Sequence, residues 1–234
     1  MRQDSRLSFL ECFLGSTSGL TSLVLSRCDD LEKLCGIEQL TFLKSLKISG
    51  MRRSLKDIRS LQSCTSLICL KLPQVEAGLD VLGSLNLLKS IALKGNGALE
   101  SLQQCSGSIQ PDTLELLVSP QLQDLKFLKD FPTVKALTVS AKNFTSVCGV
   151  EHCSDLKELR LPLCKELRLD GLKALQACEV LETLVLPKEV YEVDRERARE
   201  YFPQCSFESS KDYTFTVGPE DIACFRQRLS SVSE

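Results

Sequence analysis

Apolar side chains return along this chain in a fixed order, with polar side chains between them. Leu156, Leu159 and Leu161 stand at the first, fourth and sixth positions of one short segment, and Cys164 follows at the ninth. The same frame occurs eight times, with first positions 21 to 25 residues apart. These first positions are Leu20, Leu43, Leu67, Leu88, Thr113, Val134, Leu156 and Leu181. A period of this length indicates a stack of repeated structural units.

The spacing within each frame predicts one coil per repeat. Positions 4 and 6 are two residues apart, so they point to the same side of a short strand, while positions 3 and 5 point to the other side. Further apolar residues then follow at near-helical spacing, as Leu55, Ile58 and Leu61 do. A single strand with a helical return cannot bury its apolar side alone, so the coils are expected to stack around a continuous core.

The repeated frame resembles the leucine-rich-repeat family, whose repeat reads L-x-x-L-x-L-x-x-N/C-x-L. The resemblance covers about residues 20–210. It implies an α/β leucine-rich-repeat solenoid that is curved, with a parallel β-sheet on the concave face and short helices or 3₁₀ segments on the convex face. Only Cys28, Asn96 and Cys164 fit the Asn/Cys position, so the repeats resemble an irregular type with short-repeat and cysteine-containing features.

Three parts of the chain are expected from this frame. Residues 1–19 are predicted to cap the core, and residues 20–210 hold eight clear repeats and a ninth, degenerate unit at Gln204, Phe207 and Ser209. Residues 211–234 are predicted to form a C-terminal cap, a strand and a helix with a short mobile tail. The strand is expected around Phe215.

Other segments carry more specific expectations. The helix of the C-terminal cap begins near Pro219, and its apolar stripe of Ile222, Phe225 and Leu229 either covers the core or docks on a partner. Residues 191–203 are predicted to be one α-helix, and residues 103–112 are predicted to be a surface loop. Within residues 191–203, the side chains expected to face the core are Val193, Ala198, Tyr201 and Phe202.

The cysteines look like core residues rather than a disulfide framework. The chain has twelve cysteines, and Cys64, Cys153 and Cys178 each precede a first position by three residues. This usage favours a reducing, intracellular location in the cytoplasm or nucleus. Basic and hydroxyl residues before residue 9 leave import into the mitochondrion open. No apolar run approaches the roughly 18 residues of a membrane span.

No catalytic chemistry is evident in the sequence. Phosphate-binding loops, nucleophile elbows and paired-histidine metal motifs are absent, and His152 is the one histidine. His152 adjoins Cys153, but the matched ligand spacing of a zinc site is missing. We therefore expect no enzyme activity, no cofactor, no metal and no small-molecule substrate.

The predicted solvent-facing side of the sheet is rich in positive charge. Frame positions 2, 3, 5, 7 and 8 hold ten basic and three acidic residues, a net charge of +7, whereas the whole chain carries −2. The acidic residues are Glu115, Glu158 and Glu182, and Arg27 and Lys188 complete the basic set. The candidate partner-binding residues are Lys44, Lys47, Lys71, Lys89, Lys94, Lys135, Lys157 and Arg160. Apolar anchors are expected on the same face at Leu114, Leu117, Leu163 and Val185.

This face predicts a protein-interaction module, a scaffold or subunit of a larger complex that binds an acidic segment of another protein. The alternative is a ribonucleoprotein component that contacts the RNA backbone, although the face lacks aromatic residues for base stacking. The family resemblance also leaves open a substrate adaptor or a phosphatase-regulator-like protein. Lysine is also simply tolerated on a solvated sheet, in which case the charge has no partner.

Overall fold

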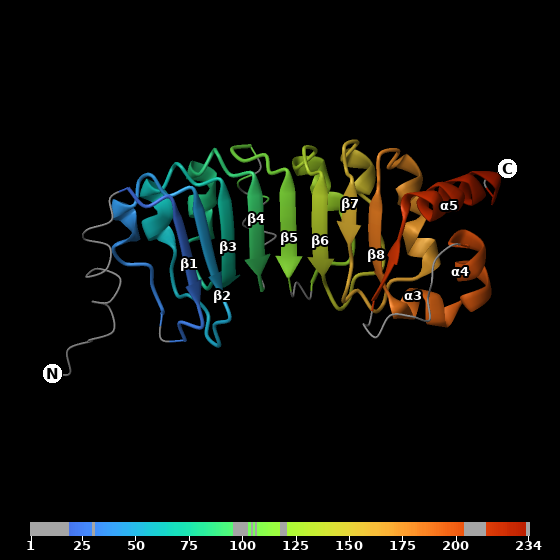
Figure 1. The fold of residues 1–234 in the computed structure, drawn as a ribbon, viewed down its shortest axis with the longest axis horizontal. Coiled ribbons are helices and arrows are strands. Elements are labelled where there is room, and N and C mark those ends of the chain that lie inside the picture. The colour runs from blue at the N-terminus through green and yellow to red at the C-terminus, as the bar shows by residue number, and fades with distance from the viewer. Residues whose placement is uncertain are drawn as a thin grey trace. The chain divides into compact units, whose positions relative to one another are not determined.

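The computed structural model describes residues 19–29, 31–95, 103, 105, 107–117, 121–203 and 214–232. The chain divides into two compact units, Met1–Pro111 and Asp112–Glu234, here called unit 1 and unit 2. Each unit is described separately, and Figure 1 shows the strands of each lying side by side. Among the described residues, no helix has the length and apolar character needed to span a membrane.

Unit 1 contains a sheet of four parallel strands in the order β1-β2-β3-β4. A short 3₁₀ segment follows each of the first three strands, which confirms the predicted coil. The elements are β1 (Ser22–Ser26), η1 (Ile37–Gln39), β2 (Ser45–Ser49), η2 (Arg59–Ser63), β3 (Cys69–Gln74), η3 (Leu79–Ser84) and β4 (Ser90–Lys94).

Unit 2 repeats this arrangement and ends differently. Its strands β5 to β8 are parallel, and the last strand, β9, pairs antiparallel with β8. The elements are β5 (Thr113–Leu117), η4 (Lys126–Asp130), β6 (Ala136–Ser140), η5 (Val150–His152), β7 (Glu158–Arg160), η6 (Leu169–Ala177), β8 (Thr183–Pro187), α3 (Lys188–Val193), α4 (Arg195–Tyr201), β9 (Thr214–Val217) and α5 (Pro219–Val232).

Strand pairing confirms the predicted frame in most repeats. Leu46, at position 4, pairs with Leu23 on one side and with Leu70 on the other. The corresponding residues of unit 2, Leu137 and Leu159, also face each other. All five side chains are buried. Residues at the same frame position therefore form rows across each sheet, as stacking of one repeated coil requires.

The fifth repeat was predicted in the wrong register. Leu114 pairs with Leu137, so Leu114 occupies position 4 and Leu116, which pairs with Val139, occupies position 6. The predicted frame had placed both residues two positions earlier. The first position of this repeat is therefore Pro111 rather than Thr113. The shift moves Leu114 from position 2, which was predicted to face solvent, to position 4, where its side chain is buried in the core.

Both cores are built from the apolar rows, and buried cysteines belong to them. Cys64, Cys153 and Cys178 are buried as predicted. The thiols of Cys64 and Cys153 donate to main-chain carbonyls of the preceding coil, at 3.3 Å from Ile37 O and 3.4 Å from Phe131 O. The ten cysteines among the described residues are all free thiols. These side chains thus fill the core and also tie each coil to its neighbour.

The C-terminal strand and helix form where the alternation and the apolar stripe indicate. Ile222, Phe225 and Leu229 are buried within unit 2. Phe225 stacks on Phe202 with ring centroids 5.2 Å apart. The stripe therefore packs against the chain itself and is not available to a partner.

Residues 191–203 do not form the single helix that was predicted. Two short helices, α3 and α4, meet at Asp194, whose carboxylate accepts a hydrogen bond from the main-chain N–H of Arg197 at 3.2 Å. Asp194 thereby caps the second helix and ends the first. Ala198 is buried as expected, but Val193 is 60% exposed because it lies at the break.

The described residues of the segment 103–112 include an irregular stretch, as predicted, but two of its side chains are anchored in the core. Cys105 and Ile109 are buried, and the Ile109 N–H donates to Cys105 O at 3.2 Å. The predicted terminal tail begins at residue 230, but α5 continues to Val232, so residues 230–232 are helical. Several other predictions fall outside the described residues: the N-terminal cap up to residue 18, the Asn96 turn, the degenerate ninth unit and the last two residues of the tail.

Candidate functional site

The candidate site is the side of each sheet that the 3₁₀ segments do not cover, which we call the open face. Positions 4 and 6 of the frame point into the core, so the open face is formed by positions 2, 3, 5, 7 and 8. In the corrected register, position 2 of the fifth repeat is Asp112. This carboxylate joins the three predicted acidic residues, so the ten basic residues face four acidic ones and the net charge becomes +6.

The open face of unit 1 carries basic residues and no acidic residue at any of its frame positions. All these frame positions are described, and five of the six basic side chains are exposed while the sixth, that of Lys71, is half-buried. The six basic residues are Arg27, Lys44, Lys47, Lys71, Lys89 and Lys94. The whole positive excess of the two faces therefore belongs to unit 1.

The lysines of unit 1 are brought together by strand pairing. Lys47 and Lys71 are direct partners on β2 and β3. Neighbouring strands lie about 4.8 Å apart, so these two like charges stand side by side. Lys44 and Lys89 form a second row, with Ile68 between them: the Ile68 N–H donates to Lys44 O, and the Lys89 N–H donates to Ile68 O, both at 2.8 Å.

One basic residue of unit 1 is held in an unusual backbone conformation. Arg27 has φ of 57°, and it is the one residue other than glycine with positive φ in the described part of the chain. Glycine occupies the same frame position in two other repeats, as Gly50 and Gly95, with φ of 68° and 100°. A side chain with a Cβ is strained in this region of φ, so Arg27 stands where the fold favours glycine.

The open face of unit 2 has as many acidic as basic residues, and three pairs of opposite charge on it are in contact. Lys135 Nζ lies 3.2 Å from the Asp112 carboxylate. Lys157 Nζ lies 3.2 Å from the Glu182 carboxylate. The Arg160 guanidinium is in direct contact with Glu158. The candidate residues of this half are therefore placed against carboxylates, and the net charge of the face is zero.

The apolar anchors predicted on unit 2 are mostly unavailable. Leu114 and Val185 are buried, at 0% and 7% exposure. Leu114 lies in the core because of the register shift, and Val185 pairs with Thr216 of β9. Leu117 is half-buried, and Leu163 alone of the four is largely exposed.

Sequence reasoning missed a group of exposed apolar residues in unit 1. Phe42 and Leu87 each precede a first position by one residue, and they are 62% and 57% exposed. Ile68, at position 2 of the repeat between them, is 41% exposed. Phe42 and Leu87 lie at the turn before each strand, outside the frame positions that define the open face. The sequence contains the pattern that reveals them: the residue before the first position is Phe42 in the second repeat, Ser66 in the third and Leu87 in the fourth.

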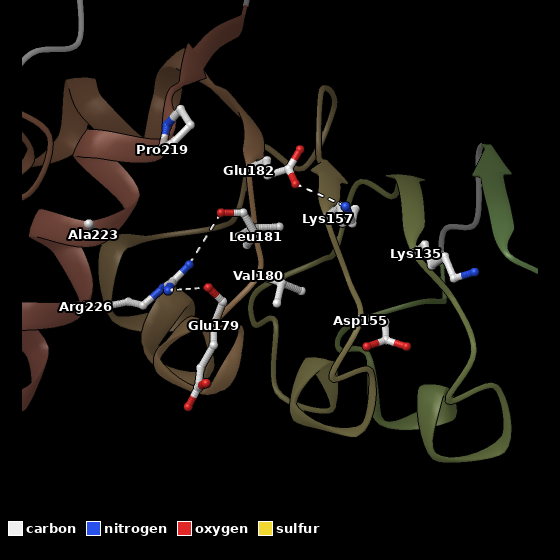
Figure 2. Close-up of a pocket in the computed structure, with 10 residues that line it drawn as sticks. All are labelled: Lys135, Asp155, Lys157, Glu179, Val180, Leu181, Glu182, Pro219, Ala223 and Arg226. Atoms are coloured by element: carbon white, nitrogen blue, oxygen red, sulfur yellow. Dashed lines mark hydrogen bonds and ion pairs between the residues drawn. The ribbon is translucent and has the colours of Figure 1, made fainter.

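The corresponding edge of unit 2 is a groove of about 680 Å³ with α5 as one wall. Figure 2 shows Val180 and the Lys157–Glu182 ion pair beside Arg226, whose guanidinium donates to Glu179 O and Leu181 O. Pro219 and Ala223 of α5 complete the wall. The edge of unit 2 is therefore bordered by a helix, and Val180 within the groove is 42% exposed.

The described residues contain no cluster of three or more His, Cys, Asp or Glu side chains arranged to hold a metal ion. His152 is exposed at the end of η5, beside buried Cys153. Burial raises the pKa of the Cys153 and Cys164 thiols to about 12. These thiols stay protonated at neutral pH, which is unfavourable for a nucleophile or a metal ligand.

Sequence comparison finds no relatives, whereas comparison of structures finds many. No family model matches the chain, and no curated protein matches it. TLR13, solved as a complex with ssRNA13, is 18% identical with a TM-score of 0.52; the match covers 70% of this chain and 25% of TLR13.

Two further solved structures are similar at lower TM-scores. A chain of the mouse RP105/MD-1 complex is 20% identical; the match covers 75% of this chain and 37% of that one, with a TM-score of 0.49. The leucine-rich repeat domain of the type III effector XopL is 18% identical, with 80% and 71% covered and a TM-score of 0.48. The match to TLR13 shows a shared fold, and this chain spans only a quarter of that protein.

Proposed function

For a chain that has the leucine-rich-repeat fold, we propose a non-catalytic role as a protein-interaction module, a scaffold or subunit that holds an acidic segment of another protein. The surface that binds this segment is the open face of unit 1. The open face of unit 2 has no net charge, so it does not contribute to the attraction of the acidic segment. This restricts the binding residues to Lys44, Lys47, Lys71, Lys89 and Lys94, with Arg27 added.

The observation that carries the proposal is the charge of the unit 1 face, six basic residues and no acidic one. Lys47 and Lys71 are adjacent on paired strands, and like charges that face each other across strands are destabilising. An acidic ligand that binds between the two lysines relieves this repulsion, which adds to the free energy of binding. Complementary charge also raises the rate at which such a ligand arrives.

RNA is a competing ligand for the same cations, and TLR13 is a solved example of this fold in a complex with RNA. Contact through phosphates alone would make the affinity fall steeply with salt. The frame positions of the unit 1 face hold no Phe, Tyr or Trp on which bases could stack, and Phe42 at its edge is the one exposed aromatic side chain among the described residues of unit 1. We therefore favour an acidic protein segment and treat RNA as an outcome of the test.

The test is affinity capture with the full chain from native extract, in parallel with and without RNase. The Lys44→Glu/Lys47→Glu variant removes and reverses two exposed charges of unit 1, and Lys157→Glu is the matched exposed substitution on unit 2. We expect protein partners that resist RNase, weaken with salt, are lost with the double variant and are kept by Lys157→Glu. Thermal unfolding should be nearly unchanged in both.

Retention of all partners by the double variant would contradict the proposal. Loss of all partners on RNase treatment would replace the acidic protein segment with RNA as the ligand.

A further inference from the structure

Three large apolar side chains are exposed on neighbouring coils of unit 1. Phe42, Ile68 and Leu87 belong to three consecutive repeats. We call them the apolar triad. Burying a side chain of this size stabilises a protein by about 1.5–3 kcal/mol. The exposed side chains of unit 1 do not contribute this stabilisation.

Main-chain hydrogen bonds fix where the apolar triad lies. Ile68 is bonded to Lys44 on one side and to Lys89 on the other, each at 2.8 Å. Phe42 and Leu87 precede these two lysines by two residues, at the turns where the strands begin. The apolar triad therefore lies at the edge of the open face, with Lys44 and Lys89 beside it.

Chemically, this arrangement is an apolar centre with a basic rim. Lys44 and Lys89 are exposed, and Lys47 continues the basic surface along β2. Protein-binding surfaces commonly combine a few large apolar anchors with a polar rim. A rim of one sign selects a partner whose apolar side chains are flanked by the opposite sign.

We propose that the apolar triad, together with Lys44 and Lys89, binds an amphipathic helix of a partner protein that carries large apolar side chains on one face and carboxylates beside them. This inference rests on the proposed function and names the kind of acidic segment that the unit 1 face receives. The acidic residues pair with the lysines, and the apolar residues cover Phe42, Ile68 and Leu87.

The spacing of the repeats fits a helix that lies across the strands. Neighbouring coils lie about 4.8 Å apart, so Phe42 and Leu87 are separated by about 10 Å across the sheet. A helix rises 1.5 Å per residue, so side chains at i, i+3 or i+4, and i+7 are spread over about 10 Å on one face. Such a helix offers one apolar side chain to each of the three coils.

Unit 2 provides an internal reference for this mode of packing. Val180 occupies the frame position that Phe42 and Leu87 occupy in unit 1, and it lines the groove beside α5. Arg226 of α5 donates to the main-chain oxygens of Glu179 and Leu181 on either side of it. A helix of the chain itself thus borders this edge in unit 2 (Figure 2), although Val180 stays 42% exposed and α5 packs on η6 and α4.

The experiment is selection of peptides from a phage-displayed random library of about 14 residues, four helical turns, on the immobilised full chain. A synthetic copy of a selected peptide is then titrated by fluorescence anisotropy. We expect enriched sequences with apolar residues at i, i+3 or i+4, and i+7 and with Asp or Glu beside them. Phe42→Ser/Leu87→Ser should weaken binding by about 10- to 100-fold, since truncation of two anchors has effects of this size. The exposed control Leu163→Ser should change it less than about twofold, within the range of a neutral contact.

The outcomes separate this inference from the proposed function. Acidic peptides that bind Phe42→Ser/Leu87→Ser as tightly as the natural chain, but not Lys44→Glu/Lys47→Glu, overturn the apolar triad and leave the acidic face standing. Enrichment of peptides without carboxylates, or no enrichment at all, overturns the inference as well. Binding lost with either double variant and kept with Leu163→Ser supports it, provided circular dichroism shows unchanged folding.

Discussion

The open faces of the two units are built on the same frame and differ in charge. Unit 1 presents six basic residues and no acidic one, whereas unit 2 presents four of each, with three contacts between opposite charges. Positions 4 and 6 are apolar in both because the core demands it, and the open positions carry no such constraint. The repeat therefore determines the scaffold, while the charge of the solvent-facing rows can differ from one unit to the other without affecting the core.

Stability does not explain this difference. Exposed ion pairs such as Lys135–Asp112 contribute about 0–1 kcal/mol each, so the pairs of unit 2 add little to its folding. Their main consequence is that the field of the unit 2 face is cancelled. Unit 1 keeps its repulsive lysine neighbours instead. The stability of the fold therefore does not require the difference in charge, which is the basis of the binding role proposed for unit 1.

Substitutions in the core should have the largest effect, because they destabilise the folded state of the unit that carries them. Leu70→Asp in unit 1 and Leu159→Asp in unit 2 each place an unpaired charge at a position with 0% exposure, which costs roughly 4 kcal/mol or more. We expect loss of the native circular dichroism melting transition and, by hydrogen exchange, loss of protection centred on the substituted coil. A native melting curve for either variant would mean that the register of that unit is wrong.

Alkaline pH should affect unit 2 more than unit 1. In unit 2, burial raises the pKa of the Cys153 and Cys164 thiols to about 12 and that of Cys178 to about 11. In unit 1, burial raises the pKa of the Cys64 thiol to about 11. The unfolded thiols ionise near 9.0. Between that pH and the folded pKa the unfolded state binds fewer protons, so stability is complete below pH 9 and falls as the pH rises above it.

The expected loss at about pH 10 is roughly 1 kcal/mol for each buried thiol. Hydrogen exchange in urea at about pH 7 and pH 10, with peptides assigned to each unit, measures it. Cys153→Ala should flatten the pH dependence of unit 2 and leave that of unit 1 unchanged. Equal alkaline sensitivity of both units would contradict the assignment of these thiols to the unit 2 core.

Neutralising the carboxylates of unit 2 should make its face resemble that of unit 1. Asp112→Asn/Glu182→Gln removes the partners of Lys135 and Lys157, and the net charge of the face rises from zero to +2. We expect a change in unfolding free energy below about 1 kcal/mol and a few-fold tighter binding of an acidic peptide, measured by anisotropy at low salt. Unchanged affinity would show that charge on the unit 2 face is irrelevant to binding.

The smallest expected effect concerns the strained arginine. Arg27→Gly relieves a positive φ of 57°, and we expect a gain in stability of up to about 1 kcal/mol in urea titrations. Binding of an acidic peptide should weaken a few-fold because one charge of the unit 1 face is lost. Arg27→Ala, which keeps the strain and removes the charge, separates the two effects. Full binding by both variants would exclude Arg27 from the binding surface.

The predictability of the fold follows from how the core is encoded. Leucines at positions 4 and 6 are needed in every coil, so their period gives the strands and the rows directly. The fifth repeat was predicted in the wrong register because Leu114, Leu116 and Val118 are each two residues apart, so two registers satisfy the spacing of positions 4 and 6. Only the pairing with β6 distinguishes them. The break at Asp194 was missed because a helix-forming composition continues through it.

The candidate site was less predictable, for a physical reason. Sequence shows which residues face solvent, but it does not show which charges on different coils meet. Glu182 lies 25 residues from Lys157 and still forms an ion pair with it. Burial of Val185 depends on β9, which pairs with β8 from a distant part of the chain. Contacts between coils therefore decide the electrostatics, and these require the structure.

The reversed direction of β9 limits how this architecture can grow. A parallel strand leaves an edge on which one more coil of the same kind can be added, and β9 occupies that edge of β8 in the opposite sense. An extra coil inserted before β8 would meet a matching neighbour on each side. One inserted after β8 would displace β9 and uncover the apolar side of α5. Duplication of repeats, in evolution or by design, is thus permitted upstream of β8 and blocked downstream of it.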